Sequence, residues 1–185
     1  MARGRAGGRK ERAPVMKLLG AALVVGSAAL IGNTVARNYS ERPRQLAEMA
    51  SAFAVLETEI SYARTPLSDA LARACGARRG VAAHMFRQAA RLIGSGELVP
   101  GDAWETAVRR AYASSALAPE DRDVLLAFGA NLGSCGAEDQ LRHVALARER
   151  LRANEAAARD EASRMARMWR YLGVTVGAMV AILLY

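Results

Sequence analysis

Two cysteines and two histidines are the side chains best suited to metal or redox chemistry: Cys75, Cys135, His84 and His143. Structural zinc sites place their ligands in close pairs such as CxxC, and none of these four residues has such a neighbour. The cysteines lie 60 positions apart, so one disulfide could form, although buried free thiols are the commoner arrangement. We therefore expect no metal site and no cofactor.

Acid–base chemistry would have to start from Glu57, which falls in an apolar helical stripe that includes Phe53. A carboxylate there is costly to bury unless it is paired, and Arg64, about two turns further on, could pair with it. We interpret Glu57 as half of a structural ion pair, because no second catalytic group is spaced nearby. The chain also lacks the GxxxxGK[ST] of a phosphate-binding loop. We predict no catalytic residue and no enzyme activity.

The formal charge of +8 raises the possibility of nucleic-acid binding. Residues 1–17 alone contribute +5, whereas residues 37–170 hold 20 arginines against 17 acidic residues. Only 5% of the residues are aromatic, so few rings could stack on bases. Because the basic excess is concentrated in a short tail, we do not expect a nucleic-acid partner.

Uncharged apolar segments lie near both ends of the chain. Residues 18–36 contain no charged side chain, and about 20 apolar residues are enough for a helix to cross a bilayer. The C-terminal segment is shorter, but Trp169 and Tyr171 could lie at the interface while Arg170 snorkels. We predict transmembrane helices over residues 16–36 and 171–185. Small residues could let these helices pack closely, or could merely reflect an alanine-rich chain: Ala22, Gly26, Ala28, Gly32, Gly173 and Gly177.

The start of the chain allows several interpretations. Its basic residues, apolar run and Thr-Val-Ala also resemble a signal peptide cleaved after Ala36. Residues 1–15 form a basic tail, typical of disorder, which translation from Met16 would leave out. With the tail counted, the positive-inside rule places the middle of the chain outside the cytoplasm. With a start at Met16, the same rule places the middle in the cytoplasm.

Residues 37–170 predict an all-α fold, an antiparallel bundle of helices. Apolar residues recur there at three- and four-residue steps, and good helix formers dominate. Thr65 and Asp102 are predicted to cap two helices, and Pro119 to begin another. No helix breaker lies between Glu138 and the C-terminal membrane segment, so we expect a long stalk helix that continues to that segment.

Several stretches resemble the stage III sporulation protein AB family. They are YSERPRQL after the first apolar segment, LETEISYARTPLSDAL, SGELVPGDAWETA and LGSCGAEDQLRHV, followed by the C-terminal apolar helix. The resemblance covers residues 16–185 and is specific, because separate stretches agree in order and spacing. Gly136 departs from it, since an acidic residue is expected there. The central helices are also similar to the helical domain of type II secretion protein F, which implies about six helices.

The resemblance implies a location and partners. Such proteins lie in the mother-cell membrane facing the forespore, with the central domain in the cytoplasm, and belong to a channel assembly between the two cells. The expected partners are a stage III sporulation protein AA-like ATPase, other membrane proteins of the channel complex and the membrane. The segment implied to bind a partner is Glu41, Arg42, Pro43, Arg44 and Gln45. Alternatively, Pro43 only kinks the exit from the membrane, and the charges meet lipid headgroups.

The resulting hypothesis is a non-catalytic, membrane-anchored platform that couples a secretion-type ATPase to the sporulation channel. The alternative is a secreted or membrane-tethered helical interaction protein of unrelated function. A mature N-terminus at Arg37 would support the secreted form. An enzyme with a site inside the bundle is disfavoured, because the sequence shows no converging ligands and no nucleophile with its base.

Overall fold

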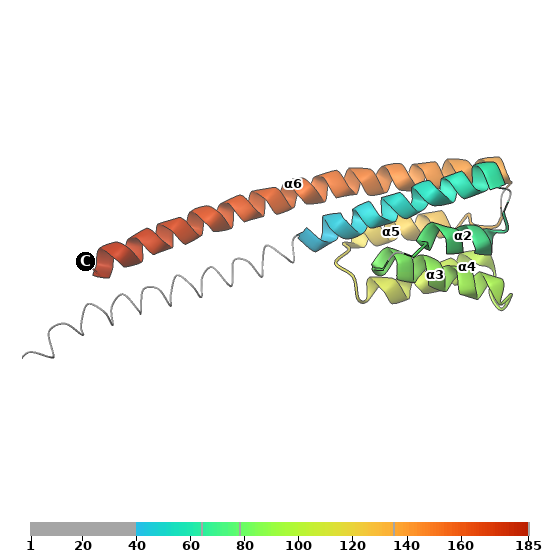
Figure 1. Ribbon diagram of the computed structural model, residues 1–185, viewed down its shortest axis with the longest axis horizontal. Coiled ribbons are helices and arrows are strands. Elements are labelled where there is room, and N and C mark those ends of the chain that lie inside the picture. Colours follow the sequence, from blue (N-terminus) through green and yellow to red (C-terminus); the bar gives the residue numbers. More distant parts are fainter. Residues whose placement is uncertain (1–39, 64, 78, 135, 185) are drawn as a thin grey trace, which may run out of the picture. The chain divides into compact units, whose positions relative to one another are not determined.

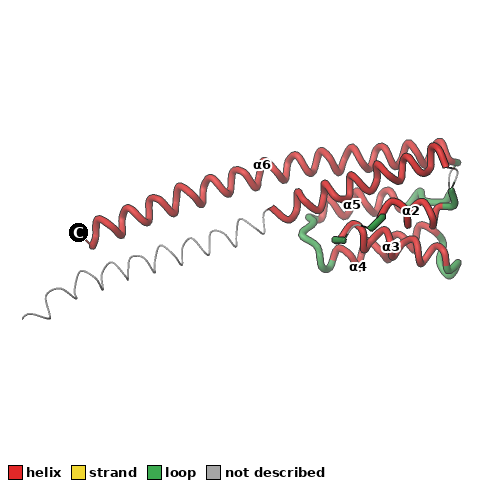
Figure 2. Tube along the Cα trace, viewed as in Figure 1, coloured by secondary structure: helices red, strands yellow, loops and turns green. Residues whose placement is uncertain are grey.

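The structure is a computed structural model that describes residues 40–63, 65–77, 79–134 and 136–184. The regular elements in these residues are all helices (Figures 1 and 2), which confirms the predicted helical bundle. Two compact units are present: the bundle, Tyr39–Glu161, and a unit whose described part is the remainder of the last helix. The predicted domain over residues 37–170 included a stalk helix in addition to the bundle, and its boundaries stay predictions.

The bundle begins with a helix over residues 40–58, here named the first bundle helix, which passes directly into a short π-helix. The remaining elements follow through short connections. The π-helix and the α-helices are η1 (Glu59–Ala63), α2 (Leu67–Cys75), α3 (Val81–Gly94), α4 (Pro100–Tyr112), α5 (Pro119–Gly129) and α6 (Ala137–Leu184). The long stalk helix predicted after Glu138 is therefore present as α6.

The predicted transmembrane helices stay predictions. Residues 16–36 lie outside the described part of the chain, and residues 171–184 form the end of α6. Among the helices that the structure does describe, none combines the length and apolar character needed to cross a membrane.

The first bundle helix lies antiparallel to the bundle part of α6 (Figure 1). Glu57 forms an ion pair with Arg148 at 2.5 Å, and Arg42 lies 3.8 Å from Glu161. Residue numbers therefore increase along the first bundle helix in the direction in which they decrease along α6, as expected for antiparallel helices. Glu57 is half of a structural ion pair, as predicted, but its partner comes from a helix distant in sequence. The predicted partner, Arg64, lies outside the described residues.

Four aromatic side chains from four helices form the centre of the core. Phe53, Phe86, Trp104 and Phe128 meet edge to face, with ring centroids 5.0–5.9 Å apart. Such pairs contribute about 0.5–1.5 kcal/mol each beyond the area they bury. Trp104 Nε1 also donates a 2.8 Å hydrogen bond to the backbone oxygen of Leu125. The core therefore joins the first bundle helix, α3, α4 and α5.

The helix starts rest on prolines more than on capping side chains. Pro66 occupies the cap position of α2, where Thr65 was predicted, and no side chain caps that helix. Helix α4 begins with Pro100, so Asp102 lies in the first turn instead of capping it. Both cap predictions are therefore wrong, because proline presets the backbone for a first helical turn. Helix α5 begins at Pro119 as predicted.

Candidate partner-binding surfaces

The predicted partner segment lies in the first turns of the first bundle helix, and most of it faces the bundle. Pro43 is buried and Gln45 is only 8% exposed. The Arg42 side chain is 21% exposed. Glu41 and Arg44 point outward, and Arg44 Nη2 donates to Glu41 Oε2 at 2.6 Å. The segment therefore offers two side chains to solvent and uses three inside the protein.

Arg42 is the hub of a polar cluster that also contains Glu120, Asp121, Asn154 and Glu161, here named the Arg42 cluster. Its Nε donates to Asp121 Oδ2 at 2.8 Å, and its Nη2 donates to Asp121 Oδ1 at 3.1 Å. The same Nη2 donates to Glu120 Oε1 at 3.0 Å. A planar guanidinium suits such two-point recognition of a carboxylate. The cluster joins the first bundle helix to α5 and α6.

Asp121 is fully buried, with 0% of its surface exposed. Asn154 Nδ2 donates to its Oδ1 at 2.7 Å, and the backbone N–H of Ala118 donates to its Oδ2 at 2.9 Å. The carboxylate lies in the first turn of α5, where the helix dipole favours negative charge. Its hydrogen bond with Arg42 is the main cause that raises the pKa of that guanidinium, against the opposing effect of burial.

Gln45 adds a second connection close to the Arg42 cluster. Its Oε1 accepts a 2.9 Å hydrogen bond from the backbone N–H of Ala116, in the connection before α5. Partner binding by the predicted segment stays a prediction. A partner that binds this segment while the bundle stays folded can contact the side chains of Glu41 and Arg44.

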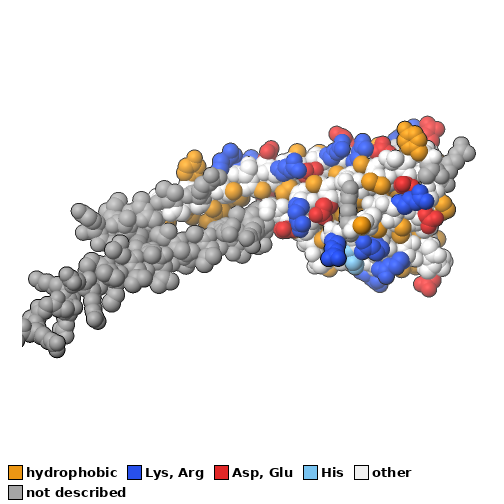
Figure 3. Space-filling view, in the orientation of Figure 1, with side chains coloured by type: hydrophobic (Ala, Val, Ile, Leu, Met, Phe, Trp, Pro, Cys, Tyr) orange, Lys and Arg blue, Asp and Glu red, His pale blue; other side chains and the backbone are white. Residues whose placement is uncertain are grey.

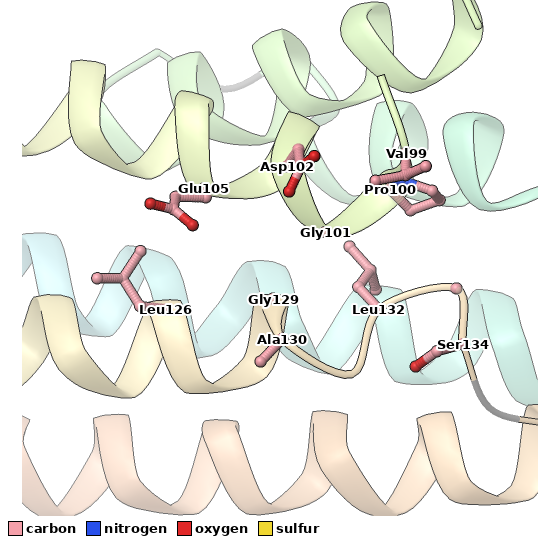
Figure 4. Close-up of a pocket in the computed structure, with 11 residues that line it drawn as sticks. Val99, Pro100, Gly101, Asp102, Glu105, Leu126, Gly129, Ala130, Leu132 and Ser134 are labelled. Carbon is pink, nitrogen blue, oxygen red and sulfur yellow. The ribbon is translucent and has the colours of Figure 1, made fainter. Parts of the chain in front are cut away.

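A groove of about 450 Å³ opens between the start of α4 and the end of α5 (Figure 4). The start of α4 closely approaches the end of α5 and the turn that follows it, since a Cβ on Gly129 would overlap the Trp104 ring and a Cβ on Gly133 would overlap Pro100. Asp102 and Glu105 line the groove from α4, and Leu126 lies on the opposite side (Figure 4).

Two titratable side chains, Asp102 and Glu105, are among the described residues that line the groove. Its described lining consists of apolar and glycine residues with two acidic side chains and Ser134, whose Oγ donates to the backbone oxygen of Asn131. No histidine, cysteine or basic side chain belongs to this lining. The described lining of the groove therefore offers no basic site for phosphate.

The four possible metal ligands do not come together in the described residues. Cys75 is a buried free thiol on α2, which matches the expected state of that cysteine. His84 is exposed on α3 and His143 is half-buried on α6, whereas Cys135 lies outside the described residues. Within the described ranges no group of three or more potential ligands is found.

The residues predicted to pack membrane helices fall largely outside the description. Ala22, Gly26, Ala28 and Gly32 are not among the described residues. Gly173 and Gly177 lie on α6, and a Cβ on Gly173 would meet no described atom within 4 Å. Their role in helix packing stays a prediction.

Sequence reasoning missed Asp121 as a partner of Arg42, and Asn154 as a partner of Asp121. The pairs that define the Arg42 cluster are separated by 79 and 33 positions in the chain. One local signal was available, because Asp121 follows Pro119 in the first turn of α5 and accepts from the backbone of Ala118. That signal predicts a carboxylate at a helix start, but not the arginine that reaches it.

Fold and surfaces together define a helical-bundle protein whose main polar cluster joins its own helices. A family model described as stage III sporulation protein AB matches residues 17–185. Over 170 residues the chain is 30% identical to stage III sporulation protein AB of Bacillus subtilis (strain 168), which covers 92% of this chain and 99% of that relative. A solved structure of stage III sporulation protein AB matches with a TM-score of 0.62 and 29% identity, over 66% of this chain and 97% of that one. The chain therefore belongs to the stage III sporulation protein AB family, as its sequence predicted.

Proposed function

We propose that the protein is a membrane-anchored, non-catalytic platform of the sporulation channel between mother cell and forespore. In this role it couples a secretion-type ATPase, similar to stage III sporulation protein AA, to the channel. Family membership supports a function in sporulation. The apolar segments at residues 16–36 and 171–185 support anchoring in the mother-cell membrane that faces the forespore. The central domain then lies in the cytoplasm, where an ATPase can reach it.

The Arg42 cluster is the structural observation that carries the proposal furthest. Arg42 lies near the start of the bundle, 3.8 Å from Glu161 at its end. These are the two points where the bundle continues toward the predicted membrane segments. An ion cluster that ties them together, with Asp121 fully buried at its centre, fixes both exits relative to α5.

The chemistry of the described side chains suits binding better than catalysis. The described lining of the groove offers two carboxylates but no histidine, cysteine or basic side chain. The ion pairs of the bundle join helices or lie along one helix, such as Arg148 with Glu57 and Arg109 with Glu105. The names of the relatives refer to a stage of sporulation and mention no enzyme activity. We therefore assign the energy source to the partner ATPase.

Membrane anchoring is tested by extracting the protein from sporulating cells. We expect it to stay in the membrane fraction after washing with alkaline carbonate and to enter detergent. Release by carbonate, together with a mature N-terminus at Arg37, would favour the alternative of a secreted helical interaction protein. Cysteine accessibility at exposed bundle positions then places the central domain, and we expect labelling only from the cytoplasmic side.

A further inference from the structure

One stretch of the bundle contains basic residues but no acidic ones. Between Asp69 and Glu97 the chain has no aspartate or glutamate, whereas it has five arginines and one histidine. The rest of the bundle alternates charges and neutralises many arginines locally, as in Arg44 with Glu41 and Arg159 with Glu155. The acid-free stretch covers most of α2 and all of α3. Any carboxylate that compensates its charge must therefore come from another part of the chain, as Glu59 does for Arg73.

Helix α3 presents this charge on a single face. His84, Arg87 and Arg91 are exposed, and the only other exposed residue of the helix is Gly94. Their spacing of three and four residues places them on one side of a helix. The opposite side, which includes Met85 and Phe86, is buried in the core.

The end of α4 lies beside the start of α3 and adds to the charge. Phe86 of α3 packs on Trp104 of α4, with ring centroids 5.2 Å apart, and a short connection makes the helices antiparallel. Exposed Arg110, six positions after Trp104, is therefore about level with Arg79, which precedes α3. Figure 3 shows arginine side chains, with a histidine among them, gathered where α3 begins and α4 ends. We name Arg79, His84, Arg87, Arg91 and Arg110 the basic patch.

The composition of the basic patch points to a protein carboxylate surface as its ligand. Among the described residues no ion pair involves Arg79, Arg91 or Arg110. Surface helices that bind membranes insert apolar side chains, but the apolar side of α3 is already used in the core. Surfaces that bind single-stranded nucleic acid add aromatic side chains for stacking, and the patch has none. Arginine forms two-point hydrogen bonds with carboxylates.

We propose that the basic patch is a docking surface for an acidic face of a partner protein. From position 80 to position 91 the α3 portion is about 16 Å long, which fits one helix or strand of a partner laid across it. The first partner to test rests on the proposed function, since the ATPase named there must contact the bundle. The charge requirement itself holds for any protein that docks at this surface.

The test uses the full chain reconstituted in nanodiscs of pure phosphatidylcholine, so that no anionic lipid takes part. Binding of the purified stage III sporulation protein AA-like ATPase is measured for the parent and for the variant Arg91→Glu/Arg110→Glu. Each reversal places a carboxylate opposite a carboxylate, so we expect Kd to rise about 10- to 100-fold. The control Arg142→Glu/Arg150→Glu changes two exposed arginines of α6 by the same charge, and its Kd should stay at the parent value. Circular dichroism checks that both variants are folded, and Arg91→Gln/Arg110→Gln replaces the reversal if it unfolds.

Equal weakening by patch and control variants, or weakening by the control alone, would overturn the proposal. The proposal would also be overturned if the Kd for the ATPase is the same for the patch variant and the parent, and anionic lipid added without any other protein protects α3 from hydrogen exchange. If the parent does not bind the ATPase at all, the coupling function fails, and the patch is judged separately. A photo-crosslinker at position 84 in sporulating cells should then join a protein segment rich in Asp and Glu. No protein adduct at position 84 would count against the patch.

Discussion

Replacing Arg42 by methionine should destabilise the bundle strongly, because it removes the cation from a buried carboxylate. Asp121 is 0% exposed and would keep only two neutral donors, Asn154 Nδ2 and the N–H of Ala118. Removing one partner of a buried ion pair costs about 3–5 kcal/mol. The two remaining donors and the 21% exposure of Arg42 place the expected loss near the lower end of that range.

The assay is urea unfolding of residues 37–170, followed by circular dichroism at the helical minimum. We expect this fragment to fold as a helical monomer or weak oligomer. With a urea dependence of about 2 kcal/mol per molar, a loss of about 3 kcal/mol lowers the midpoint by about 1.5 M. The matched control is Arg44→Met, because Arg44 lies two positions away and its partners Glu41 and Glu48 are near the surface. Its midpoint should stay close to that of the parent.

A double variant tests the mechanism of this loss. In Arg42→Met/Asp121→Leu the buried carboxylate is removed together with its cation, and the carboxylates of Glu120 and Glu161 that lose Arg42 are exposed. The double variant should therefore be more stable than Arg42→Met alone. Equal midpoints for Arg42→Met and Arg44→Met would refute the reasoning. The reasoning would also be refuted if the double variant lost as much stability as the single variants Arg42→Met and Asp121→Leu lose together.

The charge of Arg42 has to be removed by substitution, because no practical pH deprotonates its guanidinium. The pKa of Arg42 is raised in the folded state, chiefly by its hydrogen bond with Asp121. A raised pKa contributes stability that is fully present below the unfolded pKa and is lost as pH rises through the folded one. Both lie above the range in which the protein can be studied, so the guanidinium stays charged in every practical buffer.

Three further predictions concern the core, a helix contact and the mature chain. Phe53→Ala removes the ring that touches three other aromatic side chains and should cost about 3–5 kcal/mol in the same urea assay; a loss below 1 kcal/mol, a typical surface effect, would contradict the aromatic core. Gly129→Ala forces a methyl group onto the Trp104 ring and should cost about 1–3 kcal/mol. The control Gly136→Ala has open space around its Cβ and should be near neutral. Similar melting curves for both variants would contradict the close contact between α4 and α5. N-terminal sequencing of the protein from sporulating cells should give a start at residue 1 or 16, and a start at Arg37 would instead identify a cleaved signal peptide.

The sequence allowed prediction of features that depend on neighbouring residues. Proline has a fixed backbone angle and no N–H, so Pro119 marked the start of α5 and Pro100 a break before α4. The caps were mispredicted at Thr65 and Asp102, because a proline one or two positions away already set the start of each helix. The periodicity of apolar residues identified the helices well but could not show which residue begins each one.

Pairings between distant helices were beyond the sequence. Nothing local distinguishes Arg42, which lies in the bundle interface, from Arg44, which lies at the surface. Their environments differ because a helix turns by about 100° per residue, and only the packed structure shows which side meets α5. The same reason explains why Arg148 was not predicted as the partner of Glu57. The resemblance to the family located the segment around Arg42, whereas the structure showed how each side chain is used.

The most direct test of the platform function is binding of the purified stage III sporulation protein AA-like ATPase to the full chain in detergent. We expect saturable binding in the presence of the membrane segments, and no ATP hydrolysis by the chain alone. A variant that opens the Arg42 cluster, such as Arg42→Met, should bind more weakly than Arg150→Met, which changes an exposed arginine of α6 outside the predicted partner segment. If the intact chain does not bind the ATPase in detergent, or hydrolyses ATP without it, the protein is not the platform proposed here.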